Sequence, residues 1–167
     1  MTDLAALLDQ LDDIRVQTLL RLDGLNQDEL DFVPSAGPGE SLEARWSLGE
    51  IFMHLALDEH YLREHIARPL LEGVQPPAGV SFLPPPPPYG TPKDVILFWF
   101  DRARTLTRRL VENLPANANL ALKHSGGLKP MNGLEWLEAY GGHEEFHHRQ
   151  VDALIAQMVE LAEPAYA

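Results

Sequence analysis

Hydrophobic residues recur at helical spacing in four segments of this chain. In residues 3–25, leucines and an isoleucine return every three or four positions on one face, while aspartates occupy the other, as in an amphipathic helix. The same period runs through residues 47–69, 91–115 and 132–161. No segment alternates with the period of two that indicates a strand. The pattern predicts an all-α protein, an antiparallel four-helix bundle, formed by a single domain of residues 1–167.

Two of these helices have clear start signals. Ser47 stands three residues before Glu50, and Asn132 stands three residues before Glu135. A side-chain acceptor followed by Glu at this spacing predicts a capping box. Glu50 is therefore assigned to the start of a helix and not to catalysis, while Gly24 is expected to stop the first helix.

Prolines mark the other boundaries. Thr91 is expected to cap the third helix with Pro92 as its first residue, and Pro69 is expected to end the second helix. Residues 73–90 are rich in proline and include the run Pro84–Pro88, which favours an extended connector, with a ligand for another protein as the alternative. On the third helix, the positions expected to be buried are Phe98, Trp99, Leu106, Leu110 and Leu114.

Charge and composition exclude several classes of function. The 167 residues include 25 Asp and Glu but 13 Lys and Arg, a formal net charge of −12, which would repel nucleic acid. There is no cysteine, so disulfides, thiolate ligands and cysteine nucleophiles are excluded. No run is long and apolar enough to cross a bilayer, and the N-terminus lacks the pattern of a secretory signal. We therefore expect a cytoplasmic protein with no membrane or nucleic-acid partner.

The histidines carry the candidate chemistry. His143 and His147 lie four residues apart in the fourth segment, on the stripe expected to face the interior, so their imidazoles can converge on one ion. His54 borders the apolar face of the second segment. One imidazole from one helix and a pair from another would hold a divalent metal and leave positions open for water or substrate. The spacing predicts a catalytic metal site.

Other interpretations of these residues stay open. A solvent-exposed, His-rich turn is the alternative for the pair, and a satisfied, half-buried imidazole is the alternative for His54. Gly141 and Gly142 are costly inside a helix, and they indicate a close approach by a neighbouring helix or by a substrate. The remaining histidines are expected at the surface or in loops: His60, His65, His124 and His148.

Residues 143–147 also match H-E-x-x-H, the zinc-peptidase signature in which the glutamate, here Glu144, is the general base. The extended form of that motif fails, because Gln150 and Ala153 stand where it needs Gly and His. A peptidase is therefore the weaker alternative. Within a histidine site, Glu144 or Asp58 is a candidate for a catalytic role or for orienting an imidazole.

Two segments form a specific combination. Residues 46–55 read W-S-L-G-E-I-F-M-H-L, and Asp58 and Glu59 follow as an acidic pair. Residues 143–151 read H-E-E-F-H-H-R-Q-V, which contains H-x-x-x-H-x-x-Q-V. Together they resemble the DinB-like (DinB/YfiT) superfamily of four-helix-bundle metalloproteins, whose second and fourth helices carry these patterns.

The resemblance implies a divalent metal ion, zinc or nickel, held by His54, His143 and His147. It also implies a homodimer and thiol-dependent transferase, isomerase or hydrolase chemistry. Because the chain has no cysteine, the thiol would be a small molecule. We expect a metal that activates water or this thiol for transfer or hydrolysis on a small-molecule substrate. The alternative is a non-catalytic metal-binding or stress-related helical protein.

Overall fold

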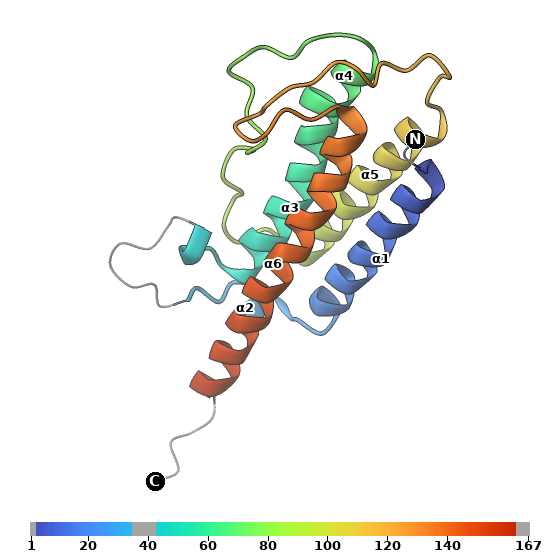
Figure 1. Cartoon of the computed structure of the whole chain (residues 1–167). Coiled ribbons are helices and arrows are strands. Elements are labelled where there is room, and N and C mark those ends of the chain that lie inside the picture. Colours follow the sequence, from blue (N-terminus) through green and yellow to red (C-terminus); the bar gives the residue numbers. More distant parts are fainter. Residues whose placement is uncertain (1–2, 35–42, 163–167) are drawn as a thin grey trace.

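Helices make up the regular structure of the described chain (Figure 1). The computed structural model describes residues 3–34 and 43–162, and the elements within these ranges are helical, apart from one isolated β-bridge between His124 and Met131. The prediction of an all-α protein is confirmed. In chain order the elements are α1 (Leu4–Asp23), α2 (Gln27–Leu30), η1 (Glu43–Arg45), α3 (Leu48–Leu62), η2 (Arg63–Ala67), α4 (Arg68–Leu71), α5 (Lys93–Glu112) and α6 (Gly133–Ala162).

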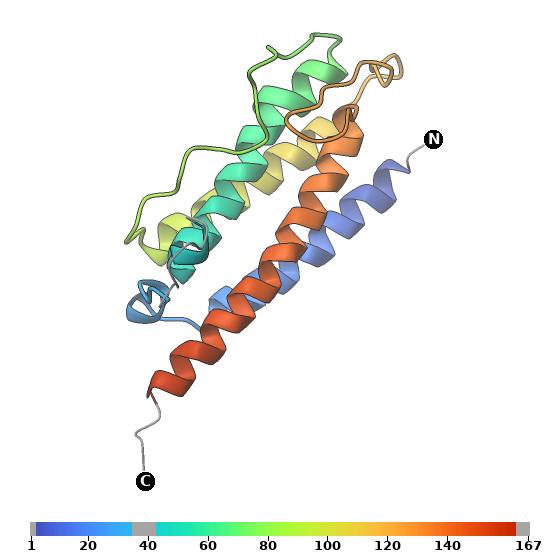
Figure 2. The ribbon, with the colours of Figure 1, turned by 60° about the vertical axis from the view of Figure 1, so that its left-hand side comes forward.

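The long helices lie side by side (Figures 1 and 2). α3 packs against α5 and α6, and α1 packs against α6 and α5. Two apolar clusters form the core. One contains Leu11, Ile66 and Trp136, and the other contains Phe52 and Phe100. The last turns of α6 extend past the neighbouring helices (Figure 2).

The capping boxes are present at both predicted helix starts. The Ser47 hydroxyl accepts from the Glu50 backbone N–H at 3.1 Å, and the Glu50 carboxylate accepts from the Ser47 N–H at 2.7 Å. Asn132 and Glu135 make the same reciprocal pair at 3.0 and 2.7 Å. Each box satisfies two backbone donors that would otherwise lack partners at a helix start.

The predicted start of the third helix is wrong by one residue. Pro92, with extended backbone angles, is the capping residue of α5, and Lys93 is its first residue. The Thr91 hydroxyl donates to the Pro88 carbonyl at 2.9 Å, so it is not used as a cap. The free N–H of Lys93 instead donates to Oε1 of Gln27 at 3.1 Å, a partner from α2 that the local sequence does not reveal.

The prediction that Pro69 ends the second helix is also wrong. α3 continues through the π-helical turn η2 into α4, which contains Pro69 and ends at Leu71. A proline inside a helix removes a donor and its ring crowds the carbonyl four residues earlier. The wider π-helical turn immediately before Pro69 accommodates this ring without ending the continuous helical segment.

The buried face of α5 differs in part from the predicted one. Phe98 is 58% exposed, whereas Ile96, Phe100 and Val111 are at most 1% exposed. Arg104 and Thr107 share the buried face, because charged partners on other helices hold them there. Of the predicted positions, Phe98 is therefore wrong, whereas Trp99, Leu106, Leu110 and Leu114 are partly buried, and Trp99, Leu110 and Leu114 pack against the apolar clusters.

Between the two apolar clusters lies a layer of charged side chains. Arg15 on α1 donates from Nε to Glu144 Oε1 and from Nη2 to Glu59 Oε2, both at 2.7 Å. Arg104 donates from Nε to Glu59 Oε1 at 2.9 Å. We call Arg15, Glu59, Arg104 and Glu144 the buried ion network. Burial by itself raises the pKa of Glu59, but Arg15 and Arg104 lower it to about 2. The network joins α1, α3, α5 and α6.

The proline-rich segment, residues 73–90, runs from α4 to α5 along the side of α3 (Figure 2). Its backbone is held by the loop before α6, because Phe82 N–H donates to the Gly126 carbonyl at 3.2 Å and His124 Nε2 lies 2.8 Å from the Val80 carbonyl. The segment therefore has a defined path, which matters for the site described below.

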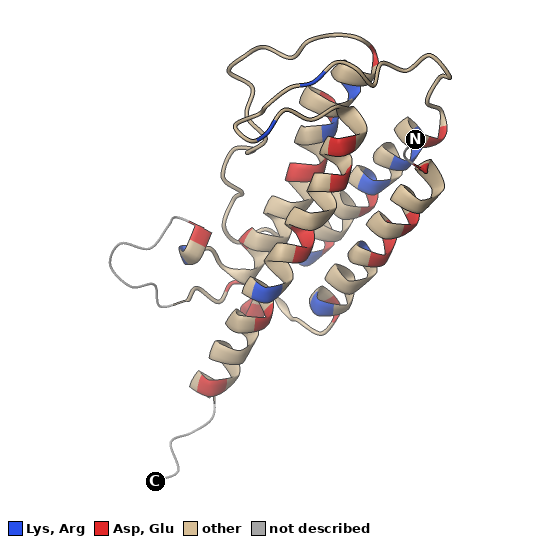
Figure 3. Cartoon of the chain, in the orientation of Figure 1, with Lys and Arg blue, Asp and Glu red and all other residues tan. Residues whose placement is uncertain are grey.

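Acidic and basic residues are interspersed along the helices (Figure 3). No helix within the described ranges combines the length and the apolar character needed to cross a membrane.

Candidate metal centre

Three imidazoles from two helices meet between α3 and α6. His54 comes from α3, and His143 and His147 come from adjacent turns of α6. Their ligand nitrogens all lie within 4.8 Å of one another, and the Nε2 atoms of His54 and His143 are 3.0 Å apart. Nitrogens bound to one zinc ion at about 2.0–2.1 Å are separated by roughly 3.0–3.4 Å, depending on the coordination geometry. The cluster therefore has the dimensions of a metal site.

The orientation of His147 is set by Gln150, one turn further along α6. Gln150 Nε2 donates to the Glu43 carbonyl at 2.9 Å, which leaves its Oε1 facing His147 Nδ1 at 2.7 Å. Nδ1 therefore carries the proton and Nε2 carries the lone pair. This Nε2 is buried and has no hydrogen-bond partner. Hydrogen bonds of this kind to the second nitrogen are typical of metal-binding histidines.

The imidazoles are neutral near pH 7, as metal ligands must be. Burial, followed by the neighbouring imidazoles of His143 and His147, lowers the pKa of His54 to about 3. Burial, followed by His147, lowers the pKa of His143 to about 4. Burial also lowers the pKa of His147. The aromatic ring of Trp46 lies 4.9 Å from that of His54 and shields one side of the cluster.

The two carboxylates proposed from the sequence lie in different places. Asp58, one turn after His54, lies beside the cluster, with Oδ2 3.5 Å from His143 Nε2. Glu144 lies on a different face of α6, toward α1, in the buried ion network and accepts from Arg15 and Thr18. No hydrogen bond joins Glu144 to the three imidazoles among the residues that the structure describes. The H-E-x-x-H pattern is present in the sequence, but its glutamate is directed away from the cluster.

The histidines predicted for surfaces or loops differ in their positions. His65 is exposed and His60 is partly buried. His148, within α6, is only 7% exposed, contrary to the prediction. His148 faces α1, where its Nε2 lies 2.8 Å from the Thr18 hydroxyl. His124 belongs to a loop, as expected, and is buried where it holds the proline-rich segment.

Gly141 of α6 allows α1 to pack closely. A Cβ atom on Gly141 would lie 2.9 Å from Leu11 Cδ2 and 3.3 Å from Ile14 Cδ1, whereas one on Gly142 would meet no atom within 4 Å. Of the two interpretations left open, a neighbouring helix is therefore the correct one for Gly141. The space beside Gly142 is open, so nothing approaches this position closely.

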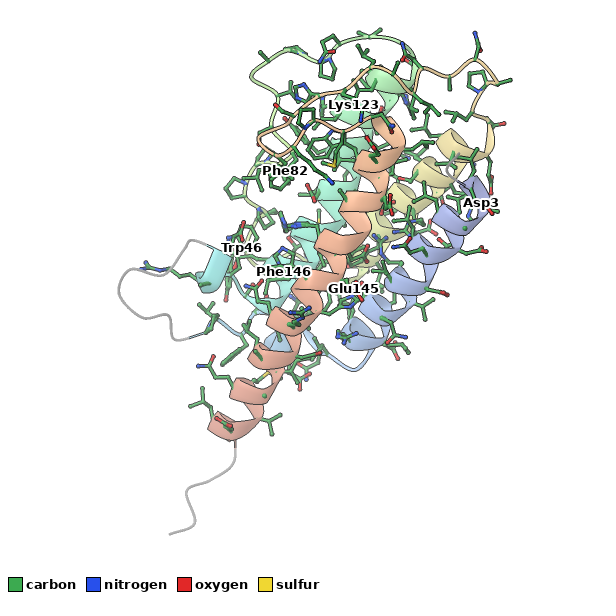
Figure 4. All side chains as sticks on the ribbon, in the orientation of Figure 1. Asp3, Trp46, Phe82, Lys123, Glu145 and Phe146 are labelled. Carbon is green, nitrogen blue, oxygen red and sulfur yellow. The ribbon has the colours of Figure 1, made fainter. Side chains whose placement is uncertain are left out.

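A pocket of about 570 Å³ opens beside His54. One wall is Trp46, and another comes from the proline-rich segment, through Leu83, Pro84 and Pro86. Phe82 of the same segment places its ring 6.3 Å from that of His143. Figure 4 shows Trp46 and Phe82 on the same side of the molecule. Sequence reasoning missed the contribution of this segment to the site, because nothing local indicates that it crosses α3 at the level of His54.

The donor set fits a divalent metal ion. His147 Nε2 and His54 Nδ1 are buried without hydrogen-bond partners, and so are both carboxylate oxygens of Asp58. Buried polar atoms are costly when unpaired, and a cation between the imidazoles would pair with His147 Nε2, while His54 would bind it through Nε2, the nitrogen that faces His143. Three neutral nitrogens without thiolate are the ligands of zinc sites that keep open positions, as in catalysis, and nitrogen ligands also suit nickel.

Comparison with known proteins agrees with this geometry. The sequence profile of the DinB superfamily matches residues 10–151 of the chain, which include the three histidines, Asp58 and the whole proline-rich segment. Neither the curated proteins nor the solved structures contain a significant match. Since the profile covers most of the 167 residues, the chain belongs to the DinB superfamily.

Proposed function

We propose that this protein is a metal-dependent enzyme that acts on a small molecule. His54, His143 and His147 would hold a divalent ion, zinc or nickel. The observation that carries the proposal is the convergence of three neutral imidazoles, one of which, His54, lines a pocket large enough for a substrate. When bound, the ion would supply Lewis-acid chemistry and lower the pKa of water or of a small thiol, for transfer or hydrolysis.

The chain's own residues would prepare the site for this chemistry. Gln150 holds His147 in the tautomer whose Nε2 can bind the ion. Trp46 and the proline-rich segment line the pocket beside His54, and a substrate that fills this pocket would exclude water from the site. Exclusion of water strengthens the electrostatic interactions within a site. The long helices would act as the rigid support, in the antiparallel four-helix arrangement that we also propose for the chain.

The walls of the pocket favour a substrate with a flat apolar part. Trp46 offers an aromatic face, and Leu83, Pro84 and Pro86 offer aliphatic surface opposite the histidine edge. Arg45, Glu43 and Glu50 add charges to the lining, so a polar group on the same substrate would also find partners. Because no cysteine is available in the chain, a thiol taking part in the reaction would be a low-molecular-weight cosubstrate.

The first experiment measures metal content. Protein without an affinity tag is freed of metal with a chelator, supplied with zinc or nickel, desalted and analysed for metal per chain. We expect about one ion per chain for the wild type and a large loss for His147→Ala. We expect Gln150→Leu to weaken binding by roughly 10–100-fold, the usual effect of removing a partner that orients a ligand. A wild type that takes up no ion would refute the proposal.

The second experiment asks whether the site is catalytic. The loaded wild type and His147→Ala are assayed against thiol adducts and esters with aromatic groups, and their melting temperatures are compared in parallel. Turnover by the wild type that His147→Ala abolishes supports an enzyme. Metal binding that stabilises the fold without turnover on any substrate of the panel would favour the alternative, a non-catalytic metal-binding protein.

A further inference from the structure

Asp58 is a buried carboxylate that has no hydrogen-bond partner. Its side chain is 1% exposed, and neither Oδ1 nor Oδ2 accepts a hydrogen bond. Burying an ionised carboxylate without a partner is among the most costly arrangements in a protein. The neighbouring Glu59 is equally buried, but it accepts from Arg15 and Arg104. The two adjacent acids therefore differ, because one has cationic partners from the chain and the other has none.

The nearest charged or polar group to Asp58 that the structure records is an imidazole of the candidate metal centre. Asp58 Oδ2 lies 3.5 Å from His143 Nε2. Among the described residues, no Lys or Arg donates to either carboxylate oxygen of Asp58. The carboxylate thus faces the histidine cluster without a cation to balance it.

The placement of Asp58 mirrors that of the histidine pair. His54 and Asp58 are four residues apart on α3, and His143 and His147 are four residues apart on α6, so each helix presents two donors from adjacent turns. The separations of 3.0 Å between His54 and His143 nitrogens and 3.5 Å between His143 and Asp58 are close to the roughly 3.0–3.4 Å between neighbouring ligands of one zinc ion. Asp58 lies outside the group of donor atoms that are all within 4.8 Å of one another, so its carboxylate would have to move toward the other imidazoles when the ion binds.

We propose that Asp58 is the fourth protein ligand of this centre, which makes it a site of three histidines and one carboxylate. The inference rests on the proposed function, because it requires that the histidines bind an ion. One anionic ligand reduces the charge of a divalent site by one. A hard oxygen donor also favours ions that accept mixed nitrogen and oxygen ligands over soft ones such as Cu(I).

The test compares Asp58→Asn with the wild type in two states. The metal-free proteins are unfolded with urea, and zinc affinity is measured by competition with a chromophoric chelator. We expect the metal-free variant to be at least as stable as the wild type, since the buried carboxyl group that it replaces has no hydrogen-bond partner. We expect its zinc affinity to fall by at least about tenfold. Glu138→Gln, which removes one exposed negative charge from α6, is the control and should keep the wild-type affinity.

Three results would contradict the inference, and each is distinct from failure of the proposed function. Asp58→Asn could bind zinc as tightly as the wild type, it could lose its fold in the metal-free state, or Glu138→Gln could lose affinity to the same extent. The first would show that the carboxylate is not a ligand, the second that it has a structural role, and the third that only net charge matters. A wild type that binds no ion would refute the proposed function itself, and this inference with it.

Discussion

Replacing Glu144 with alanine removes the acceptor at the centre of the buried ion network. The Glu144 carboxylate accepts from Arg15 Nε at 2.7 Å, from Arg15 Nη2 at 3.1 Å and from the Thr18 hydroxyl at 2.6 Å. Both Glu144 and Arg15 are buried. Removing one partner of a buried ion pair costs about 3–5 kcal/mol, because the remaining charge stays buried without its full set of partners.

The loss of stability that we expect for Glu144→Ala lies within this range and not above it. Arg15 keeps three other acceptors after the change, namely Glu59, the Tyr140 hydroxyl and the Phe100 carbonyl. We therefore expect Glu144→Ala to lower the free energy of unfolding by about 3–4 kcal/mol, which corresponds to a melting temperature lower by on the order of 10 °C for a chain of this length. Glu144→Gln, which keeps an acceptor oxygen, should lose less.

The assay is urea unfolding of the metal-free protein, followed by measurement of metal per chain. Glu145→Ala is the matched control, because Glu145 is the exposed neighbour of Glu144 on α6, and its effect should stay within about 0.5 kcal/mol. We expect Glu144→Ala still to bind the ion, since its carboxylate faces away from the histidines. A loss of stability below about 1 kcal/mol, or a loss of metal binding at unchanged stability, would refute this account and revive Glu144 as a residue of the site.

Further predictions concern packing, pH and metal. Gly133→Ala should destabilise the protein by about 1–3 kcal/mol, because its Cβ would lie 2.6 Å from a backbone carbonyl oxygen of η2. Gly142→Ala, where the space is open, should stabilise it by up to about 1 kcal/mol. Urea unfolding of both variants measures these changes. In metal-free protein carrying Asp58→Asn, the free energy of unfolding should fall by roughly 2 kcal/mol between pH 7 and pH 5.5. His54 and His143 have pKa values of about 3 and 4 in the folded state, so in this range they take up protons only when the protein is unfolded. Their contribution to stability is fully present above about pH 6.5 and decreases toward acid, and a flat profile would contradict the assignment. Zinc at 100 times its dissociation constant should raise the free energy of unfolding by about 2.7 kcal/mol in the wild type. Melting curves with and without chelator measure this gain, and His147→Ala should abolish it.

Much of the local structure follows from short-range physics that the sequence displays. The capping boxes at Ser47 and Asn132 depend on side chains three residues from the backbone groups they satisfy, so they could be predicted from spacing. The stripe through Tyr140, His147 and Val151 is likewise buried, as its period indicates. The pairing of His143 with His147 depends on one turn of helix and could be predicted in the same way.

The errors share a different cause. Phe98 was expected on the buried face of α5, but it is exposed. That face instead carries Arg104 and Thr107, whose partners come from other helices. His148 was expected at the surface, but Thr18 of α1 provides a partner for its imidazole. In each case a polar side chain is buried because a distant residue satisfies it, and hydrophobic periodicity cannot register that compensation.

The sequence by itself determined which segments are helical, where two of them start, and that histidines on two of them face inward, because these properties depend on residues within one or two turns of each other. Only the tertiary structure decided that Glu144 belongs to an ion network while Asp58 stands unpaired beside the histidines, and that the proline-rich segment forms a wall of the pocket. Those outcomes depend on contacts between residues far apart in the chain, such as Arg15 with Glu144. The energy of a buried charge is set by whatever the fold brings next to it.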